Sequence, residues 1–275
     1  MYRAEGATRL HAVHCRAMSK SPTTRFSDRV ENYVRYRPGY PPEVIDLLRA
    51  ECGLRPSHVV ADIASGTGIF TRLLLENGNS VFAVEPNQEM RAMGMQQFES
   101  LRFLQSGARL VSVAGTAEET TLHTASVDFV TAAQAAHWFD LPRARTEFVR
   151  ILKPEGWCVL IWNERCTATT PFLRDYEQLL LTYATDYKDV RHERTTAIIH
   201  EFFAPALFQE RDFSLRQQFD YAGTAGRLLS SSYAPLEGHP GHAPMMRELE
   251  RIFHAHAVDN MVEFEYSTRV YYGHL

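Results

Sequence analysis

Short apolar runs alternate with amphipathic segments through the first part of the chain, up to Arg165. Apolar runs of strand length occur at residues 58–63, 80–84, 108–113, 126–133 and 157–165. Segments with apolar residues at helical spacing follow most of these runs, and turn signals such as Asn77-Gly78 and Lys153–Gly156 separate them. The alternation predicts repeated βαβ units and therefore a parallel sheet.

The rhythm changes after this part of the chain. Residues 166–204 predict helices rich in tyrosine and charge, and residues 208–223 predict a strand pair or one long strand. The remaining segments predict two helices and an exposed alternating strand, at residues 226–235, 245–259 and 262–275. We therefore expect an α/β fold: a doubly wound, Rossmann-like, mostly parallel seven-stranded sheet with helices on both faces and helical cap insertions.

The N-terminal residues 1–24 show no periodic apolar face, so we expect a disordered or loosely attached tail. Met18 is a plausible natural start within it. The rest of the chain, 25–275, is expected to form a single domain. The segments most able to vary are the cap or substrate insertions, at about 166–204 and 223–260.

Composition narrows the class of partner. The chain has 275 residues, 45% of them hydrophobic, and a net charge of −4, so it lacks the global positive charge that favours nucleic acid or a membrane surface. Four cysteines without a C-x-x-C pair indicate a reducing compartment, which we expect to be the cytoplasm. No uncharged apolar stretch approaches the length of a membrane span. We expect a monomer or homodimer with a small-molecule substrate.

A glycine-rich turn stands where the first predicted strand passes into a helix. The run Asp62-Ile-Ala-Ser-Gly-Thr-Gly68 allows a ligand to approach the backbone closely, because glycine has no Cβ. Glu85 follows at the end of the second strand, where a carboxylate accepts hydrogen bonds from a ribose diol. Together the turn and the acid indicate a cofactor that contains adenosine.

Two cofactors compete for this turn. A nicotinamide dinucleotide favours G-x-G-x-x-G, but Thr71 stands where the third glycine would be. Asp62 favours a cofactor that carries an ammonium and a sulfonium group, since opposite charges attract at short range. The alternative role of Asp62 is a capping or turn carboxylate.

Five segments together resemble class I S-adenosylmethionine-dependent methyltransferases of the type 11 kind: DIASGTG, VFAVEPN, GTAEE, VDFVTAAQAAHWFD and LKPEGW. Within this family the sequence looks similar to the trans-aconitate and the ubiquinone/biotin-pathway methyltransferases. One departure is Ala64, where the family usually has glycine. A methyl group there is expected to be tolerated if φ is negative.

The resemblance implies cofactor contacts at the strand ends and the loops after them. Glu85 would bind the ribose hydroxyls, Gln134 would lie beside the sulfonium and amino group, and Arg37 would pair with the carboxylate. A surface salt bridge is the alternative for Arg37. The other implied contacts are Asp62 and the backbone of Ala64, Gly66 and Gly68 at the methionine and sugar, Pro86 and Met90 against the adenine, and Ala117 and Glu118 at its edge.

Substrate contacts are expected around the fourth and fifth strands and in the cap. His137 has the pKa range of a general base, although a cofactor-lining or structural histidine is the alternative. Trp138 could stack on a ligand or belong to the core. The substrate-binding candidates are Tyr33, Tyr36, Trp138, Asn163, Arg165 and Tyr233.

Three functions stay open. The first is methyl transfer from S-adenosylmethionine to an O-, C- or N-nucleophile of a small molecule, a carboxylate among them, by in-line displacement. The alternatives are a catalytically silent cofactor-binding protein and an NAD(P)-dependent oxidoreductase. No metal is expected, because the pairs of neighbouring histidines lack a full ligand set at a standard spacing.

Overall fold

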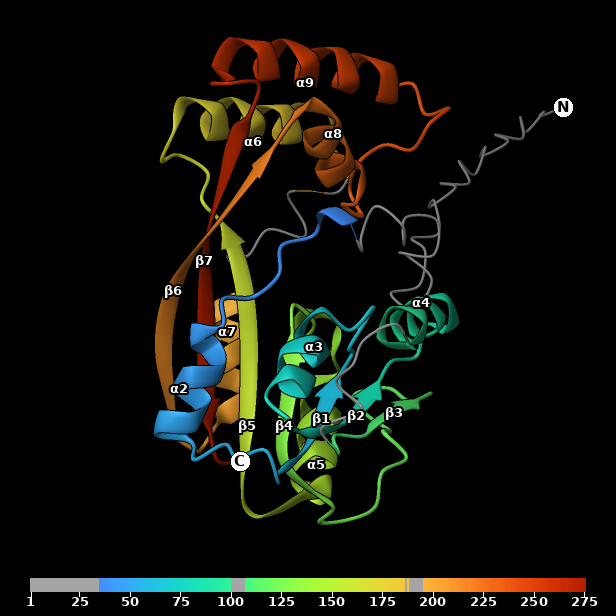
Figure 1. The fold of residues 1–275 in the computed structure, drawn as a ribbon, viewed down its shortest axis with the longest axis vertical. Coiled ribbons are helices and arrows are strands. Elements are labelled where there is room, and N and C mark those ends of the chain that lie inside the picture. Colours follow the sequence, from blue (N-terminus) through green and yellow to red (C-terminus); the bar gives the residue numbers. More distant parts are fainter. Residues whose placement is uncertain (1–34, 100–106, 186, 188–194) are drawn as a thin grey trace, which may run out of the picture.

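The computed structural model describes residues 35–99, 107–185, 187 and 195–275, so the predicted tail and Tyr33 lie outside the described residues. Its centre is a seven-stranded sheet in the order β3-β2-β1-β4-β5-β7-β6 (Figure 1). The strands are β1 (Val59–Ile63), β2 (Ser80–Val84), β3 (Leu110–Val113), β4 (Val127–Ala133), β5 (Leu152–Arg165), β6 (Phe208–Phe219) and β7 (Val262–Gly273). The first five pair in parallel, whereas β7 pairs antiparallel with both β5 and β6. The predicted fold class is confirmed.

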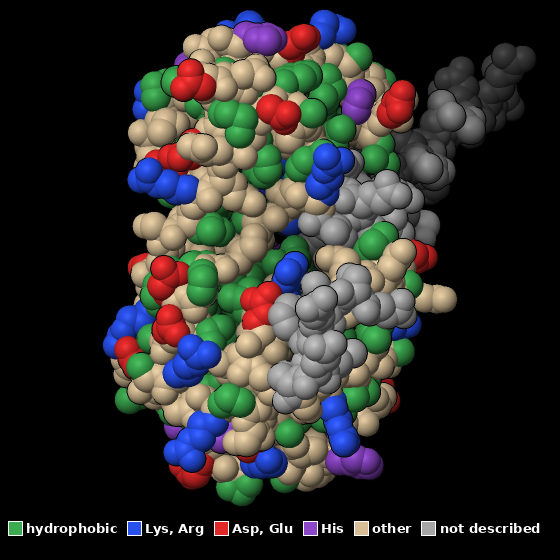
Figure 2. All heavy atoms as spheres, viewed as in Figure 1, with side chains coloured by type: hydrophobic (Ala, Val, Ile, Leu, Met, Phe, Trp, Pro, Cys, Tyr) green, Lys and Arg blue, Asp and Glu red, His purple; other side chains and the backbone are tan. Residues whose placement is uncertain are grey.

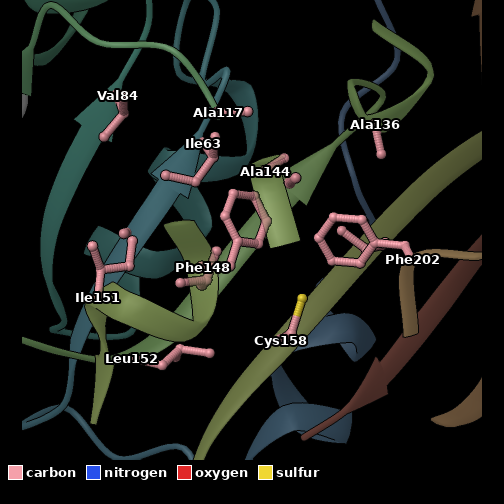
Figure 3. Close-up of a cluster of buried hydrophobic side chains, with 14 of the residues drawn as sticks. Ile63, Val84, Ala117, Ala136, Ala144, Phe148, Ile151, Leu152, Cys158 and Phe202 are labelled. Carbon is pink, nitrogen blue, oxygen red and sulfur yellow. The ribbon is translucent and has the colours of Figure 1, made fainter. Parts of the chain in front are cut away.

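Helices cover both faces of the sheet. One face packs against α2 (Glu43–Glu51), α3 (Ile69–Glu76) and α4 (Gln88–Glu99). The other packs against α5 (Leu141–Ile151) and α7 (Thr195–Phe203). Figure 3 shows the second core, where Phe148 and Ile151 of α5 lie over Ile63 and Cys158 of the sheet. The central strands β1 and β4 and the second half of β5 are largely buried, as expected for a parallel sheet between two helical layers.

A third core forms a cap at one end of the molecule. It contains α6 (Pro171–Tyr183), α8 (Tyr221–Leu229), α9 (His242–His256) and one end of β6 and β7, which extend into the cap in Figure 1. Phe264 of β7 lies at its centre, with edge-on ring contacts to Phe172 and Tyr176 of α6. We call the sheet with its two helical layers the body. The body and the cap therefore share two continuous strands, β6 and β7.

The local sequence explains the turn after β1. Gly68 has φ +85°, and a Cβ built on it would lie 2.5 Å from the ring of Phe98 in α4. Glycine is thus required both by the backbone conformation and by the close approach of α4. This turn directs the start of α3 toward the carboxyl ends of the strands.

Three details differ from the sequence predictions. Helix α8 begins at Tyr221 and ends at Leu229, so it overlaps only the first part of the predicted helix 226–235, whereas the long strand at residues 208–219 is one of the two predicted alternatives. The predicted exposed strand is wrong: β7 lies between β5 and β6, with the buried residues of its first half in the cap core and those of its last residues in the cores of the body. The predicted turn at Lys153–Gly156 lies within the first residues of β5, where Glu155 has φ +63°. Within the described ranges, no helix is long and apolar enough to cross a membrane.

Candidate cofactor and substrate site

A cavity of about 620 Å³ lies at the carboxyl ends of the parallel strands. Its walls come from the loops after β1, β2 and β4, the end of β5, and the cap. Figure 2 shows the surface hollowed between the body and the cap. Ligands of open α/β sheets bind at this edge, where the strand order reverses, so the position itself favours a ligand site.

Glu85 is held in place at the floor of this cavity. The Glu85 side chain is buried, its Oε2 accepts a hydrogen bond from the Gly66 backbone N–H at 3.0 Å, and its Oε1 accepts one from Asn87 N–H at 2.8 Å. Burial raises the pKa of Glu85, and the two backbone donors oppose that rise. A carboxylate has about four acceptor positions, so two remain for a diol.

The cavity wall includes two strained backbone positions. Ala64 has φ +53° and Gln134 has φ +57°, both left-handed conformations that residues with a Cβ adopt at a cost. The condition under which a methyl group at Ala64 was expected to be tolerated, a negative φ, is therefore not met. Strain of this kind concentrates at functional sites, where the surrounding structure imposes it.

The strand ends are tied to one another beside the cavity. Gln134 Nε2 donates to the Asn163 carbonyl at 2.7 Å, and Asn163 Nδ2 donates to the Gly39 carbonyl at 2.8 Å. Asn163 Oδ1 accepts from Thr268 Oγ1 at 2.6 Å. Asn163 thus connects β5 to β7 and to the segment before α2, and it also lines the cavity.

Asp62 lies behind the glycine-rich turn. It is buried, and its two oxygens accept hydrogen bonds from Thr71 Oγ1 at 2.5 Å and Thr131 Oγ1 at 2.8 Å. Burial raises its pKa to about 6. In this structure the carboxylate braces β1 against α3 and β4 and is not part of the cavity lining. The implied contact between Asp62 and the cofactor stays a prediction.

Tyr36 packs inside the cap and not on the cavity. Its ring meets Phe219 edge-on with centroids 6.2 Å apart, and a Cβ on Gly226 would lie 2.1 Å from it. This segment therefore packs against α8 through Tyr36, and the predicted substrate contact of Tyr36 stays a prediction. Tyr33 lies outside the described residues.

Most of the other predicted site residues line the same cavity. His137 and Trp138 lie on a short 3₁₀ turn, Ala136–Trp138, and their ring centroids are 4.7 Å apart. Gly68 is not part of the cavity lining. The predicted residues that line the cavity are Arg37, Ala64, Gly66, Glu85, Pro86, Met90, Ala117, Glu118, Gln134, His137, Trp138, Asn163, Arg165 and Tyr233.

Residues 61–160 match the family model described as a methyltransferase domain. An uncharacterized methyltransferase of Mycobacterium tuberculosis is 42% identical over 141 residues, which cover 51% of this chain and 52% of that protein. An uncharacterized methyltransferase-like protein of Schizosaccharomyces pombe is 30% identical over 162 residues, 58% of this chain and 59% of its own. Over the matched part of its sequence, the chain is similar to methyltransferases.

A solved structure shares the methyltransferase fold. The structure of a putative type II methyltransferase from Anaeromyxobacter dehalogenans is 22% identical, covers 86% of this chain and 97% of its own, and gives a TM-score of 0.62. The sequence matches to the curated relatives span only about half the length of those proteins. The match to the family model ends at residue 160, before the first cap helix begins at Pro171.

The cavity is also lined by cap residues that the motifs do not reveal. Tyr187, Arg227 and Tyr266 line the cavity from the cap side. In the sequence, the one feature that could have pointed to these cap residues is Arg227, the only charged residue in the helix Tyr221–Leu229. In the part of the chain that the structure describes, no group of three or more His, Cys, Asp or Glu side chains could hold a metal ion.

Proposed function

We propose that this chain transfers the methyl group of S-adenosylmethionine to a small-molecule acceptor. The supporting observation is the oriented Glu85 carboxylate on the floor of a cavity at the switch point of the sheet. Its two backbone contacts leave acceptor positions that suit a ribose diol. When bound, the cofactor supplies an electrophilic methyl group on a sulfonium sulfur.

The chain's own residues bind and orient the reactants. The narrow turn at Ala64 and Gly66 and the loop at Ala117 and Glu118 border the cavity where the resemblance places the cofactor. His137 lies on the turn after β4 and is the general-base candidate for an acceptor that must lose a proton. The cap closes over the strand ends, which favours an acceptor small enough to be enclosed.

Calorimetry with S-adenosylhomocysteine and NADH tests the cofactor. The Glu85→Gln variant removes the charge and should weaken S-adenosylhomocysteine binding by about 10- to 150-fold, as expected for loss of a charge-assisted hydrogen bond. The matched control is Glu89→Gln, because Glu89 is exposed on α4 just after the same strand. Binding of NADH in place of S-adenosylhomocysteine contradicts the proposal.

A catalytically silent cofactor-binding protein is the second candidate. The left-handed Ala64 favours it, since the strain and the methyl group lie in the wall that the resemblance gives to the methionine part. Transfer of label from radiolabelled S-adenosylmethionine to any member of a metabolite panel distinguishes the two functions. Label transfer supports the enzyme, and tight binding without transfer supports the silent protein.

A further inference from the structure

A buried arginine in the cap points into the same cavity. Arg227 of α8 is 6% exposed and belongs to the cavity lining. Its Nε donates to Tyr266 Oη at 3.0 Å, and one terminal nitrogen donates to Ser231 Oγ at 3.2 Å. Its guanidinium carbon lies 5.8 Å from the centre of the Tyr266 ring. The side chain is thus held by several contacts along its length.

The contacts of Arg227 with the described residues are all with neutral groups. The neighbouring arginine of the cavity differs, because a terminal nitrogen of Arg165 lies 2.5 Å from Glu177 Oε2. Hydroxyl groups satisfy hydrogen bonds but do not neutralise a charge, and a buried charge without a counter-ion is strongly unfavourable. An arginine does not escape this cost by losing its proton.

The acidic side chains that line the cavity have partners other than Arg227. Glu85 accepts from two backbone N–H groups, Glu118 accepts from Asp140 N–H at 2.9 Å, and Glu164 lies 3.5 Å from Arg269. Glu85 and Glu118 belong to the body, whereas Arg227 belongs to the cap. The cavity therefore has an acidic side at the sheet and a basic side at the cap.

We propose that Arg227 binds a carboxylate group of the methyl acceptor. This inference rests on the proposed function and names the substrate class of the same site. The planar guanidinium matches a carboxylate in charge and geometry, and the carboxylate supplies the counter-ion that none of the described residues provides there. The acidic side of the cavity repels the same carboxylate, which fixes the orientation of the acceptor.

The carboxylate of the cofactor is a second source of the same chemistry. Arg37 donates to the Ser230 carbonyl at 3.1 Å, so the two arginines meet neighbouring residues at the end of α8. The position on a cap helix favours the acceptor, because the cofactor is expected along the strand-end loops. The experiment separates the two sources by using a cofactor analogue without a carboxylate.

The experiment uses the full chain and three variants. Arg227→Met removes the charge at similar length, and Arg227→Lys keeps the charge without the planar fork. Arg247→Met is the matched control, because Arg247 is an exposed arginine of α9 outside the cavity lining. Calorimetry gives the affinity for S-adenosylhomocysteine and for methylthioadenosine, which lacks the amino-acid part. Unchanged methylthioadenosine affinity also shows that each variant is folded.

The acceptor side is probed on protein saturated with S-adenosylhomocysteine. The probes are glutarate, tricarballylate, hexanoate and phenylacetate, each compared with its uncharged amide, and the readout is the midpoint of thermal unfolding. We expect at least one carboxylate to raise the midpoint of the wild-type protein more than its amide does. Arg227→Met should weaken that ligand by about 10- to 150-fold, Arg227→Lys less, and Arg247→Met not at all.

Three results overturn the inference. If Arg227→Met weakens S-adenosylhomocysteine but not methylthioadenosine, the arginine binds the cofactor carboxylate. If no carboxylate stabilises the wild-type complex, or if amides act equally, the site does not select a carboxylate. In each of these cases binding of S-adenosylhomocysteine still stands, so the proposed function survives. Loss of that binding in the wild-type protein removes the proposed function and this inference together.

Discussion

Single residues around the cavity illustrate which features a sequence can reveal. Glu85 and the glycine-rich turn are recognisable because their roles depend on local spacing along one βαβ unit. Arg227 is not, because its burial depends on Tyr266, 39 positions further along the chain. The positive φ of Ala64 is likewise set by the surrounding fold, and the sequence shows only that alanine replaces the usual glycine.

Ala64→Gly should stabilise the protein by about 0.5–1 kcal/mol. The left-handed conformation costs alanine about 1–2 kcal/mol, and the greater freedom of glycine in the unfolded chain offsets about half of that. Urea unfolding with and without S-adenosylhomocysteine measures the change. The matched control is Ala50→Gly in the exposed face of α2, which should destabilise by about 1 kcal/mol. Equal destabilisation by both changes contradicts the assigned strain.

Asp62 should make the protein less stable as the pH rises from about 4 to about 6. Burial raises its folded-state pKa to about 6, above the ordinary value of 3.8. The folded state therefore binds the proton more tightly, and stability present below pH 4 is lost as pH rises through 6. The loss is on the order of 2–3 kcal/mol.

The Asp62→Asn variant tests this dependence. It removes the titration and leaves an amide that can still exchange hydrogen bonds with Thr71 and Thr131. Between pH 4 and pH 7 we expect the free energy of unfolding of the wild-type protein to fall relative to that of the variant. A constant difference across this range means that Asp62 does not titrate there. Taking the difference between the two proteins removes the contribution of Glu85 that is independent of Asp62 and leaves the smaller part by which the Glu85 charge raises the pKa of Asp62.

At the scale of elements, the sequence predicts those whose partners are close along the chain. Strands β1 to β5 and the helices between them follow from alternating patterns, and the structure confirms them. The place of β7 could not be predicted. It pairs with both β5 and β6, and the alternation of hydrophobic and polar residues along a strand does not indicate which strands are its neighbours. The cap helices were expected, but their boundaries depend on packing in the third core.

Gly226→Ala should separate the segment before α2 from α8. The added Cβ would lie 2.1 Å from the ring of Tyr36, so the ring or the helix must move. We expect a loss of about 1–3 kcal/mol in stability and weaker S-adenosylhomocysteine binding, because Arg37 follows Tyr36 into the cavity wall. Urea unfolding and calorimetry measure the two effects.

A second substitution checks that the contact is the cause. Adding Tyr36→Ala to Gly226→Ala removes the clash, so the double variant should be more stable than the sum of the two single changes predicts. Gly39→Ala is the control in the same segment, because a Cβ there meets nothing within 4 Å. Additive effects would show that the glycine is required for another reason.

At the scale of the whole molecule, the site lies between two packed units that share strands. The body holds two cores and the cap holds the third. The twelve-residue strands β6 and β7 pair along their full length and run from the body into the cap. The cap therefore cannot unfold without disturbing the edge of the sheet, and both units should unfold in one cooperative step.

Hydrogen exchange measures this coupling. S-adenosylhomocysteine at one hundred times its dissociation constant should stabilise the folded state by about 2.7 kcal/mol. Amides that exchange only through global unfolding then become about 100-fold slower, and this should hold for α9 in the cap as well as for β1 in the body. The two elements lie in different cores, so equal slowing shows that the ligand stabilises one cooperative unit. If β1 is protected while α9 exchanges at its original rate, the cap opens independently and the shared strands do not couple it to the site.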